Sequence, residues 1–281
     1  MADITVRNIR FDFEQPIDLD VPDDMLGTVL GALALSMTMP YLEPYLIRTM
    51  KVAIPQISDP TLALDAKHFS QQEGHHFRNH ATFNNKIRDC FDETTANALR
   101  GIESDLETDY RRFTKEKPLR WNLAYAEGFE AMTCAGALAM AETGAFESGM
   151  LPGGDVWAWH MAEEIEHRTV AFGVFDHLVG SYFYRIWFGT RAQWHYLSYI
   201  NRFAGCMAAG LGRKPRNAPS AMQRRSLRRY LSTFTPWYDP GKIELPADVE
   251  ALLARFSDMA GLAHDSRANT TGAGLPAGET A

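Results

Sequence analysis

Beyond residue 22, apolar residues recur every three or four positions along most of the chain, which is the spacing of a helix face. Long helices are predicted over 24–50, 59–90 and 92–115, with a fourth beginning at Pro118 and a fifth carrying residues 160–167, and shorter helices over 185–211, 218–234 and 246–261. Asp59 and Asp92 are suited to cap helices, and Leu151-Pro-Gly-Gly-Asp155 predicts a loop. The predicted fold class is therefore all-α.

The helices group into a bundle with additions at both ends. Residues 1–22 alternate apolar and charged side chains and predict an extended arm or a short strand. Residues 23–184 are assigned to a four-helix bundle, with 92–115 as a connecting helix that has an exposed, charged face. Accessory helices packed on the bundle are expected over 185–262. Residues 263–281 are rich in Gly, Thr and Ala and predict a disordered tail.

Composition and charge narrow the functional classes. Of the 281 residues, 46% are apolar and 22% are charged, which is an ordinary balance for a soluble globular protein. The net charge of −7 argues against a nucleic-acid-binding surface. Cys90, Cys134 and Cys206 are an odd number without metal-type spacing and favour a reducing compartment. Because residues 1–22 do not resemble a signal peptide, we expect the protein in the cytoplasm.

Two stretches are open to other interpretations. Residues 25–42 approach transmembrane length, but they contain Gly, Ser, Thr and Pro and lead into Glu43, so a buried bundle helix is favoured and no stable membrane insertion is expected. Aromatic residues are dense between Tyr182 and Phe203. They are suited to a core, to the surface of a possible homodimer or to a membrane-facing patch, and the sequence leaves the three open.

The candidate chemistry starts from two Glu-x-x-His pairs, Glu73 with His76 and Glu164 with His167. Residues three apart share a helix face, so the carboxylate and the imidazole of each pair can reach one ion. Taken singly, such a pair is more often a solvated polar face. The alternative for the whole set is a buried hydrogen-bond network without metal.

Isolated glutamates precede the pairs: Glu43 lies 30 positions before the first, and Glu127 lies 37 positions before the second. Each separation is long enough to finish one helix and return along the next. One Glu from each of two helices and a Glu-x-x-His from each of the other two form the inner shell of ferritin-like dimetal bundles. His160 lies on the same helix face as the second pair and is a further candidate. The predicted metal ligands are Glu43, Glu73, His76, Glu127, His160, Glu164 and His167.

The donor types indicate which metal these residues bind. Carboxylates bridge two ions, while neutral imidazoles cap each ion and leave positions open. Oxygen and imidazole donors without a thiolate favour iron or manganese over a structural zinc site. Two iron ions are therefore the expected cofactor, with manganese or zinc as alternatives.

Several stretches resemble a known family. They are Pro40-Tyr-Leu-Glu43, Phe69-Ser-Gln-Gln-Glu-Gly-His-His76 followed by His80, and Trp159-His-Met-Ala-Glu-Glu-Ile-Glu-His167 followed by Thr169-Val-Ala-Phe172. In these motifs, and from about residue 5 to 235, the chain resembles the bacterial family of predicted metal-dependent hydrolases. The resemblance implies a metal site and a hydrolytic activity.

The ligand spacing also resembles the carboxylate di-iron aryl-amine N-oxygenases. Their signature contains a third histidine where His160 stands and an acidic residue where Glu163 stands. This chain departs from it where Glu166 and His75 replace two arginines and where Gln72 replaces an acid. These changes leave the inner ligands in place and alter the residues around them.

Two activities follow as expectations. The first is an O2-activating oxygenase or oxidase that acts on an apolar or aromatic small molecule and needs an external electron donor. The apolar residues expected to line its pocket lie three or four positions from ligands: Phe69, Phe77, Leu123, Ala131 and Ala171. The alternative is a metal-dependent hydrolase whose two ions hold an attacking hydroxide. A second alternative is a ferritin-like protein that oxidises or stores iron.

Overall fold

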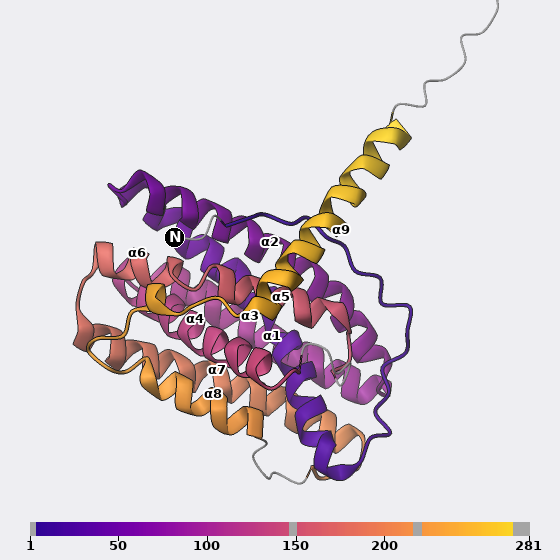
Figure 1. Cartoon of the computed structure of the whole chain (residues 1–281). Helices are drawn as coiled ribbons and strands as arrows, with labels where there is room; N and C mark the ends of the chain where they lie inside the picture. Colours follow the sequence, from indigo (N-terminus) through magenta and orange to yellow (C-terminus); the bar gives the residue numbers. More distant parts are fainter. Residues whose placement is uncertain (1–3, 146–150, 216–220, 272–281) are drawn as a thin grey trace, which may run out of the picture.

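The computed structural model describes residues 4–145, 151–215 and 221–271 (Figure 1). The predicted bundle is formed by α1 (Asp23–Ala53), α2 (Pro60–Asp89), α4 (Leu119–Glu142), α5 (Asp155–Glu166) and α6 (Val170–Leu178). The remaining helices are α3 (Glu93–Glu116), α7 (Tyr182–Gly210), α8 (Ala221–Ser232) and α9 (Ala247–Thr271). The described part of the chain contains no strand, so the all-α prediction is confirmed.

The helices begin where their capping residues place them. The Asp59 carboxylate accepts hydrogen bonds from the backbone N–H groups of Thr61 and Leu62 at the start of α2. Asp92 accepts one from the backbone N–H of Thr95, at 2.8 Å, at the start of α3. Each bond satisfies an N–H that has no partner within its helix. Both predicted starts are confirmed.

Helix α1 is the central helix of the bundle. With the short 3-10 turn up to Gln56, it is the one helix of the described residues that is long and apolar enough to cross a membrane. In its most apolar window, however, 61% of the residues are buried inside the fold. It also carries Glu43, fully buried, between Pro40 and Pro44. These are the properties of a buried bundle helix, which is the interpretation that the sequence favoured.

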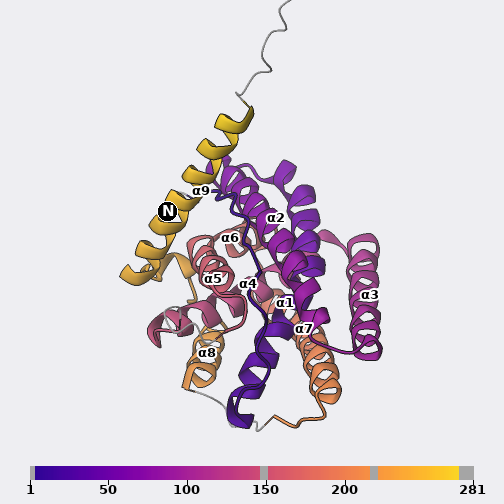
Figure 2. The ribbon, with the colours of Figure 1, turned by 90° about the vertical axis from the view of Figure 1, so that its right-hand side faces the viewer.

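The bundle helices surround one interior. Helix α1 packs along α2, and α4 packs against α5 and α6 (Figures 1 and 2). Helix α7 packs along α1 and α4, and α8 packs along α4, so these two cover the lower side of the bundle in Figure 1. Helix α3 lies outside the bundle against α1 and α7 (Figure 2). The interior therefore receives side chains from α1, α2, α4 and α5.

Helices α4 and α7 touch through their backbones at two glycines. A Cβ added to Gly128 would lie 2.9 Å from the Cα of Gly189, which is closer than real side chains approach. Only glycine at this crossing lets the two helices pack so closely. Helix α7 is therefore fixed against the helix that contributes glutamates to the interior.

The helix that was predicted after the loop of residues 151–155 is α5, and residues 160–166 form its last part. Helix α5 starts after Gly153 and Gly154, whose φ angles of 99° and 56° require glycine. It ends at Glu166, and α6 begins again at Val170. His167, at the C-cap, still donates its backbone N–H to the Glu163 carbonyl at 2.9 Å. The break therefore leaves His167 on the face that the sequence predicted.

The N-terminal arm and the first part of α9 lie against α5. Residues 4–22 form an extended arm without a strand, and Ile4, Ile9 and Phe13 are buried. The ring of Phe11 packs between Trp159 of α5 and Phe256 of α9. Helix α9 continues to Thr271 and so extends into the predicted disordered tail of 263–281, of which residues 272–281 lie outside the described part. The arm prediction agrees with the structure.

Candidate metal centre

Four glutamates and three histidines converge in the interior of the bundle. They are Glu43 of α1, Glu73 and His76 of α2, Glu130 of α4, His160 and Glu164 of α5, and His167 at the end of α5. None of them is more than 3% exposed. The structure thus brings together six of the seven predicted ligands and adds one that the sequence analysis missed.

The predicted ligand Glu127 does not join the cluster. Its Oε1 accepts a hydrogen bond from Nη1 of Arg185 of α7 at 2.8 Å, and both side chains are buried. Glu130, one helical turn later, takes the position instead, with Oε2 3.1 Å from Nε2 of His167. The prediction of Glu127 is corrected because its charge is already neutralised by Arg185.

One ligand set consists of Glu43, His76 and His160. Nε2 of His160 lies 3.6 Å from Oε1 of Glu43, and the rings of His76 and His160 stack with their centroids 4.0 Å apart. Each residue offers one donor atom within 4.8 Å of the others. An ion held here would have one carboxylate and two imidazoles.

A second set consists of Glu73, Glu164 and His167, whose donor atoms also lie within 4.8 Å of one another. Glu130 lies beside this set through its contact with His167. An ion held here would have carboxylates and one imidazole, which complements the first set.

Glu73 and Glu164 belong to the second set and also contact histidines of the first set. Oε1 of Glu73 is 3.7 Å from Nδ1 of His76 in one set and 3.6 Å from Nε2 of His167 in the other. Glu164 places Oε1 2.9 Å from Nε2 of His160 and Oε2 3.6 Å from Nε2 of His167. These two carboxylates would be placed to contact an ion held by either set.

The cluster contains buried donor atoms without partners. In the described residues, neither carboxylate oxygen of Glu43 or Glu73 has a hydrogen-bond partner, and the same is true of Oε1 of Glu130, Oε2 of Glu164 and Nδ1 of His76. None of the four carboxylates pairs with a Lys or Arg of the described chain. Buried carboxylates without a cation are costly. The residues therefore fit metal ions, and their oxygen and imidazole donors fit iron, manganese or zinc.

A comparison with protein families identifies the family of the chain. The family model described as predicted metal-dependent hydrolase matches residues 5–244. The chain belongs to this family. No curated protein and no solved structure gives a significant match. The matched segment contains the arm from Thr5 and every residue of the cluster. The resemblance of the sequence motifs to the predicted metal-dependent hydrolases is therefore confirmed.

The charges of the cluster depend strongly on burial. Burial, reinforced by the neighbouring carboxylates, raises the pKa of Glu43 well above its usual range and the pKa values of Glu73 and Glu130 to about 8. Glu164 behaves differently: burial opposes its ionisation, but His167 and His160 hold its pKa well below the usual range. Burial therefore favours the protonated form of Glu43, Glu73 and Glu130 in the metal-free protein, and metal binding is expected to release protons.

The two Glu-x-x-His segments orient each other's histidines. Nε2 of His76 lies 2.8 Å from Oε2 of Glu163, the residue before Glu164. Nδ1 of His167 lies 2.9 Å from Oε1 of Gln72, the residue before Glu73. Such bonds fix the ring and leave the other nitrogen directed at the metal. The pattern is crossed, since α2 orients the histidine of α5 and α5 orients that of α2.

Arg7 of the N-terminal arm completes the surroundings. It donates to Oε1 of Glu163 at 3.0 Å and makes two hydrogen bonds to Glu166, at 2.8 and 2.9 Å. Gln72 also donates to Glu166, at 2.7 Å. Where the aryl-amine N-oxygenase signature has an arginine at the position of Glu166, this chain places the guanidinium of Arg7 beside that glutamate. No periodic pattern in the sequence identifies Arg7 as part of the site.

His160 is also supported from α2. Its Nδ1 lies 2.7 Å from Nε2 of His80, and Nδ1 of His80 lies 2.8 Å from the hydroxyl of Ser36. Ser36 donates in turn to the side chain of Asn84. His80 therefore contributes as a support for the ring of His160, with its own nitrogens engaged by His160 and Ser36.

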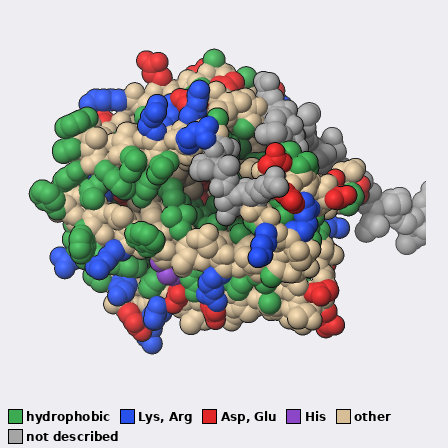
Figure 3. Space-filling view, turned by 90° about the horizontal axis from the view of Figure 1, so that it is seen from below, with side chains coloured by type: hydrophobic (Ala, Val, Ile, Leu, Met, Phe, Trp, Pro, Cys, Tyr) green, Lys and Arg blue, Asp and Glu red, His purple; other side chains and the backbone are tan. Residues whose placement is uncertain are grey.

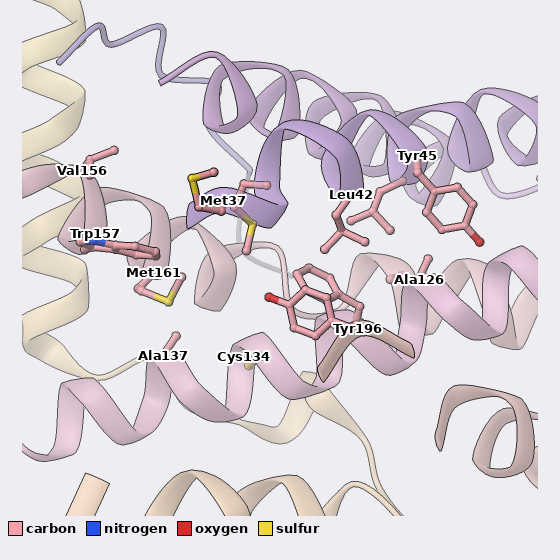
Figure 4. Close-up of a cluster of buried hydrophobic side chains, with 14 of the residues drawn as sticks. Met37, Leu42, Tyr45, Ala126, Cys134, Ala137, Val156, Trp157, Met161 and Tyr196 are labelled. Atoms are coloured by element: carbon pink, nitrogen blue, oxygen red, sulfur yellow. The ribbon is translucent and has the colours of Figure 1, made fainter. Parts of the chain in front are cut away.

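Apolar side chains enclose the cluster. His76 packs against Trp159 with ring centroids 4.7 Å apart, and Phe69 packs edge-on against His167 at 4.8 Å. Figure 4 shows a further buried layer from α1, α4, α5 and α7: Met37, Leu42, Cys134, Ala137, Met161 and Tyr196. Of the predicted lining, Phe69, Leu123, Ala131 and Ala171 are buried, whereas Phe77 is partly exposed. The donors therefore lie within an apolar interior that excludes bulk water.

The metal-free protein is expected to lose stability as the pH rises from 6.5 to 8. Over most of this window Glu73 and Glu130 keep their protons in the folded chain, where their pKa values are about 8, but have lost them in the unfolded chain. His167, whose pKa is raised well above its usual range by Glu164 and Glu130 against the effect of burial, acts in the same direction. Each retained proton lowers the free energy of unfolding by about 1.4 kcal/mol per pH unit.

The other shifted groups do not cancel this effect. Burial lowers the pKa values of His80 and His160, so both are neutral in the folded chain, and the protons that they carry in the unfolded chain are lost within about one pH unit above 6.5. Their loss opposes the effect only at the start of the window, and Glu164 is ionised in both chains. Urea unfolding at pH 6.5 and 8, with chelator and with added Mn²⁺, measures the difference. The metal should stabilise more at pH 8. Equal stability of the metal-free protein at the two pH values would contradict the assigned charges.

Proposed function

We propose that this predicted metal-dependent hydrolase holds two metal ions in the cluster and uses them to hydrolyse an ester, amide or phosphate bond of a substrate with an apolar portion. The observation that carries the proposal is the convergence of buried, unpartnered carboxylate oxygens in two ligand sets. Family membership supports hydrolysis as the reaction. The ligands would be Glu43, Glu73, His76, Glu130, His160, Glu164 and His167.

Two bound ions supply Lewis acidity that polarises a scissile bond and lowers the pKa of an attacking water. The chain's own residues prepare the site for this. Glu163 and Gln72 hold the rings of His76 and His167, so that Nδ1 of one and Nε2 of the other face the ligand sets. The protons released from Glu73 and Glu130 on loading leave both carboxylates charged. The surrounding aromatic and aliphatic side chains keep the local dielectric low, which strengthens the interactions inside.

An O2-activating oxygenase or oxidase is the second candidate. It is favoured by the burial of a thiolate-free, carboxylate-rich ligand set behind apolar side chains, an environment suited to oxidising an apolar or aromatic small molecule. The proposed metal is then iron, and an external electron donor is required. The sequence placed this activity first, and membership in the hydrolase family is the reason for reversing the order.

Turnover with and without O2 separates the candidates. We expect the protein reconstituted with Fe²⁺, Mn²⁺ or Zn²⁺ to cleave members of an ester, amide and phosphate panel at the same rate under strict anaerobiosis as in air. Glu164→Ala, prepared in parallel, is the control for contaminating hydrolases. Turnover that needs O2, iron and a reductant would replace the hydrolase by the oxygenase. Mineral formation without organic turnover would favour iron storage.

The proposal also covers the relationship of the bundle, the location of the protein and the native metal. A ferritin-like relationship of the bundle is supported by the order of its ligands: Glu43, the pair Glu73 and His76, Glu130, and then the pair Glu164 and His167. A cytoplasmic location is supported by the three cysteines, which are all free. Iron is the proposed native metal, with manganese and zinc as alternatives, and elemental analysis of the isolated protein tests this choice.

A further inference from the structure

Helix α7 presents a stripe of large apolar side chains to solvent. Phe183, Trp187 and Trp194 are 82%, 60% and 75% exposed, and Leu197 continues the same helix face. The stripe borders a shallow hollow of about 1090 Å³, which includes Phe188. Figure 3 shows apolar side chains gathered at one end of the face formed by α7 and α8, with basic side chains around them. An apolar patch of this kind marks an interaction surface.

Helix α8 and the segment after it also expose large apolar side chains. Leu227 and Leu231 of α8 are both more than half exposed, and Trp237, in the segment after α8, is as exposed as Trp194. Exposed apolar side chains therefore occur on both helices.

The same two helices carry only positive charge. Helices α7 and α8 contain seven arginines and no Asp or Glu, although the whole chain has a net charge of −7. The arginines are Arg185, Arg191, Arg202, Arg224, Arg225, Arg228 and Arg229. Four of them pair with acids of other helices: Arg185 with Glu127, Arg202 with Asp105, and both Arg225 and Arg229 with Glu142. Arg191 and Arg228 form no ion pair with an acid of the described residues, so the two helices keep unneutralised positive charge.

Two basic side chains border the apolar stripe directly. The guanidinium of Arg191 lies 4.7 Å from the ring centroid of Trp187, and that of Arg120 of α4 lies 5.3 Å from the ring of Tyr184. This arrangement places an aromatic ring beside a cation at the surface. Aromatic rings and arginines occur together in this way where a protein enters the headgroup region of a bilayer.

We propose that α7 and α8 dock the protein onto the surface of a bilayer that contains anionic lipid, with Phe183, Trp187 and Trp194 entering the headgroup region. Charge complementarity decides between this occupant and a second copy of the chain. A two-fold dimer through this face would place the same acid-free helices against each other. An anionic bilayer meets both the basic charge and the apolar stripe. The docking is peripheral, because α1 is buried in the core.

Vesicle co-sedimentation tests the proposal. We expect the full chain to sediment with vesicles of phosphatidylglycerol and phosphatidylcholine at low salt and not with phosphatidylcholine alone. The double change Trp187→Ser and Trp194→Ser should reduce the bound fraction about tenfold or more, and Arg191→Glu should weaken binding strongly at low salt. Circular dichroism verifies that these surface variants remain folded.

Helix α2 provides matched controls. Leu64 is 49% exposed and Lys67 is exposed on this helix, which lies on the far side of the bundle from α7 and α8 (Figure 1). Leu64→Ser and Lys67→Glu should bind vesicles like the unchanged protein. Failure of the unchanged protein to bind anionic vesicles, or equal binding to neutral ones, would overturn the proposal. A dimer in sedimentation equilibrium that the double tryptophan variant dissolves, without vesicle binding, would assign the face to a second copy.

Discussion

Glu130→Ala is expected to lower the metal content from two ions per chain to one or none, whereas Glu127→Gln leaves it unchanged. The reason is that Glu130 lies beside His167 in the cluster, while Glu127 is neutralised by Arg185 outside it. Removing a ligand from a closed set of carboxylates and imidazoles costs affinity directly. Elemental analysis after reconstitution with Fe²⁺ or Mn²⁺ measures the ions per chain.

The comparison needs two controls. Glu164→Ala removes a carboxylate that contacts both sets and should abolish loading. Glutamine at position 127 keeps the size of the side chain, so that a loss of folding does not imitate a loss of metal. Metal retained in Glu130→Ala and lost in Glu127→Gln would return the site to the arrangement predicted from sequence.

Arg7→Ala is expected to destabilise the protein by roughly 3–5 kcal/mol, because it leaves Glu163 and Glu166 buried without their cation. The same change frees Glu163, which orients His76, and should weaken metal binding by about 10–100-fold. Urea unfolding gives the stability, and a metal titration of the folded variant gives the affinity.

Arg10→Ala is the matched control, because Arg10 is exposed on the same arm three residues later. It should change the free energy of unfolding by less than about 0.5 kcal/mol. Arg7→Lys keeps the charge but not the paired hydrogen bonds to Glu166, so its free energy of unfolding should lie between those of Arg7→Ala and Arg10→Ala. If Arg7→Ala and Arg10→Ala have the same free energy of unfolding, the arm does not stabilise the metal centre through Arg7.

Most of the helices follow from local signals. Asp59 and Asp92 set the starts of α2 and α3 through bonds to the backbone that lie within three residues, so one sequence was enough to place them. The break between α5 and α6 was not predicted, since residues 167–169 contain neither glycine nor proline. Local propensity gave no reason for the helix to stop there.

The choice between Glu127 and Glu130 could not be made from one helix. The two residues are one turn apart and share a helix face. Because α4 is buried along most of its length, its apolar residues do not mark one side of the helix as the side that faces the interior. Arg185, which decides the matter, lies 58 positions away on α7. One signal was present in the spacing. Glu43 precedes Glu73 by 30 positions, and the corresponding separation from Glu164 is 34 for Glu130 and 37 for Glu127, so Glu130 matches the first half of the motif better.

The contribution of the N-terminal arm was likewise out of reach. Arg7 meets Glu163 across 156 positions, and an extended arm has no periodic pattern that would identify its neighbours. A single charged residue in such a segment is usually solvated. Only the folded chain reveals that the arm closes over α5 and supplies the cation.

The crossed bonds between the two Glu-x-x-His segments make the loading of the ions cooperative. Glu163 lies next to Glu164 of the second set and holds His76 of the first set, so an ion that orders Glu73, Glu164 and His167 would also fix the ring of His76. The first ion thereby meets the ordering cost for the second. The population should pass from empty to doubly loaded chains, with few singly loaded chains at half saturation in native mass spectra.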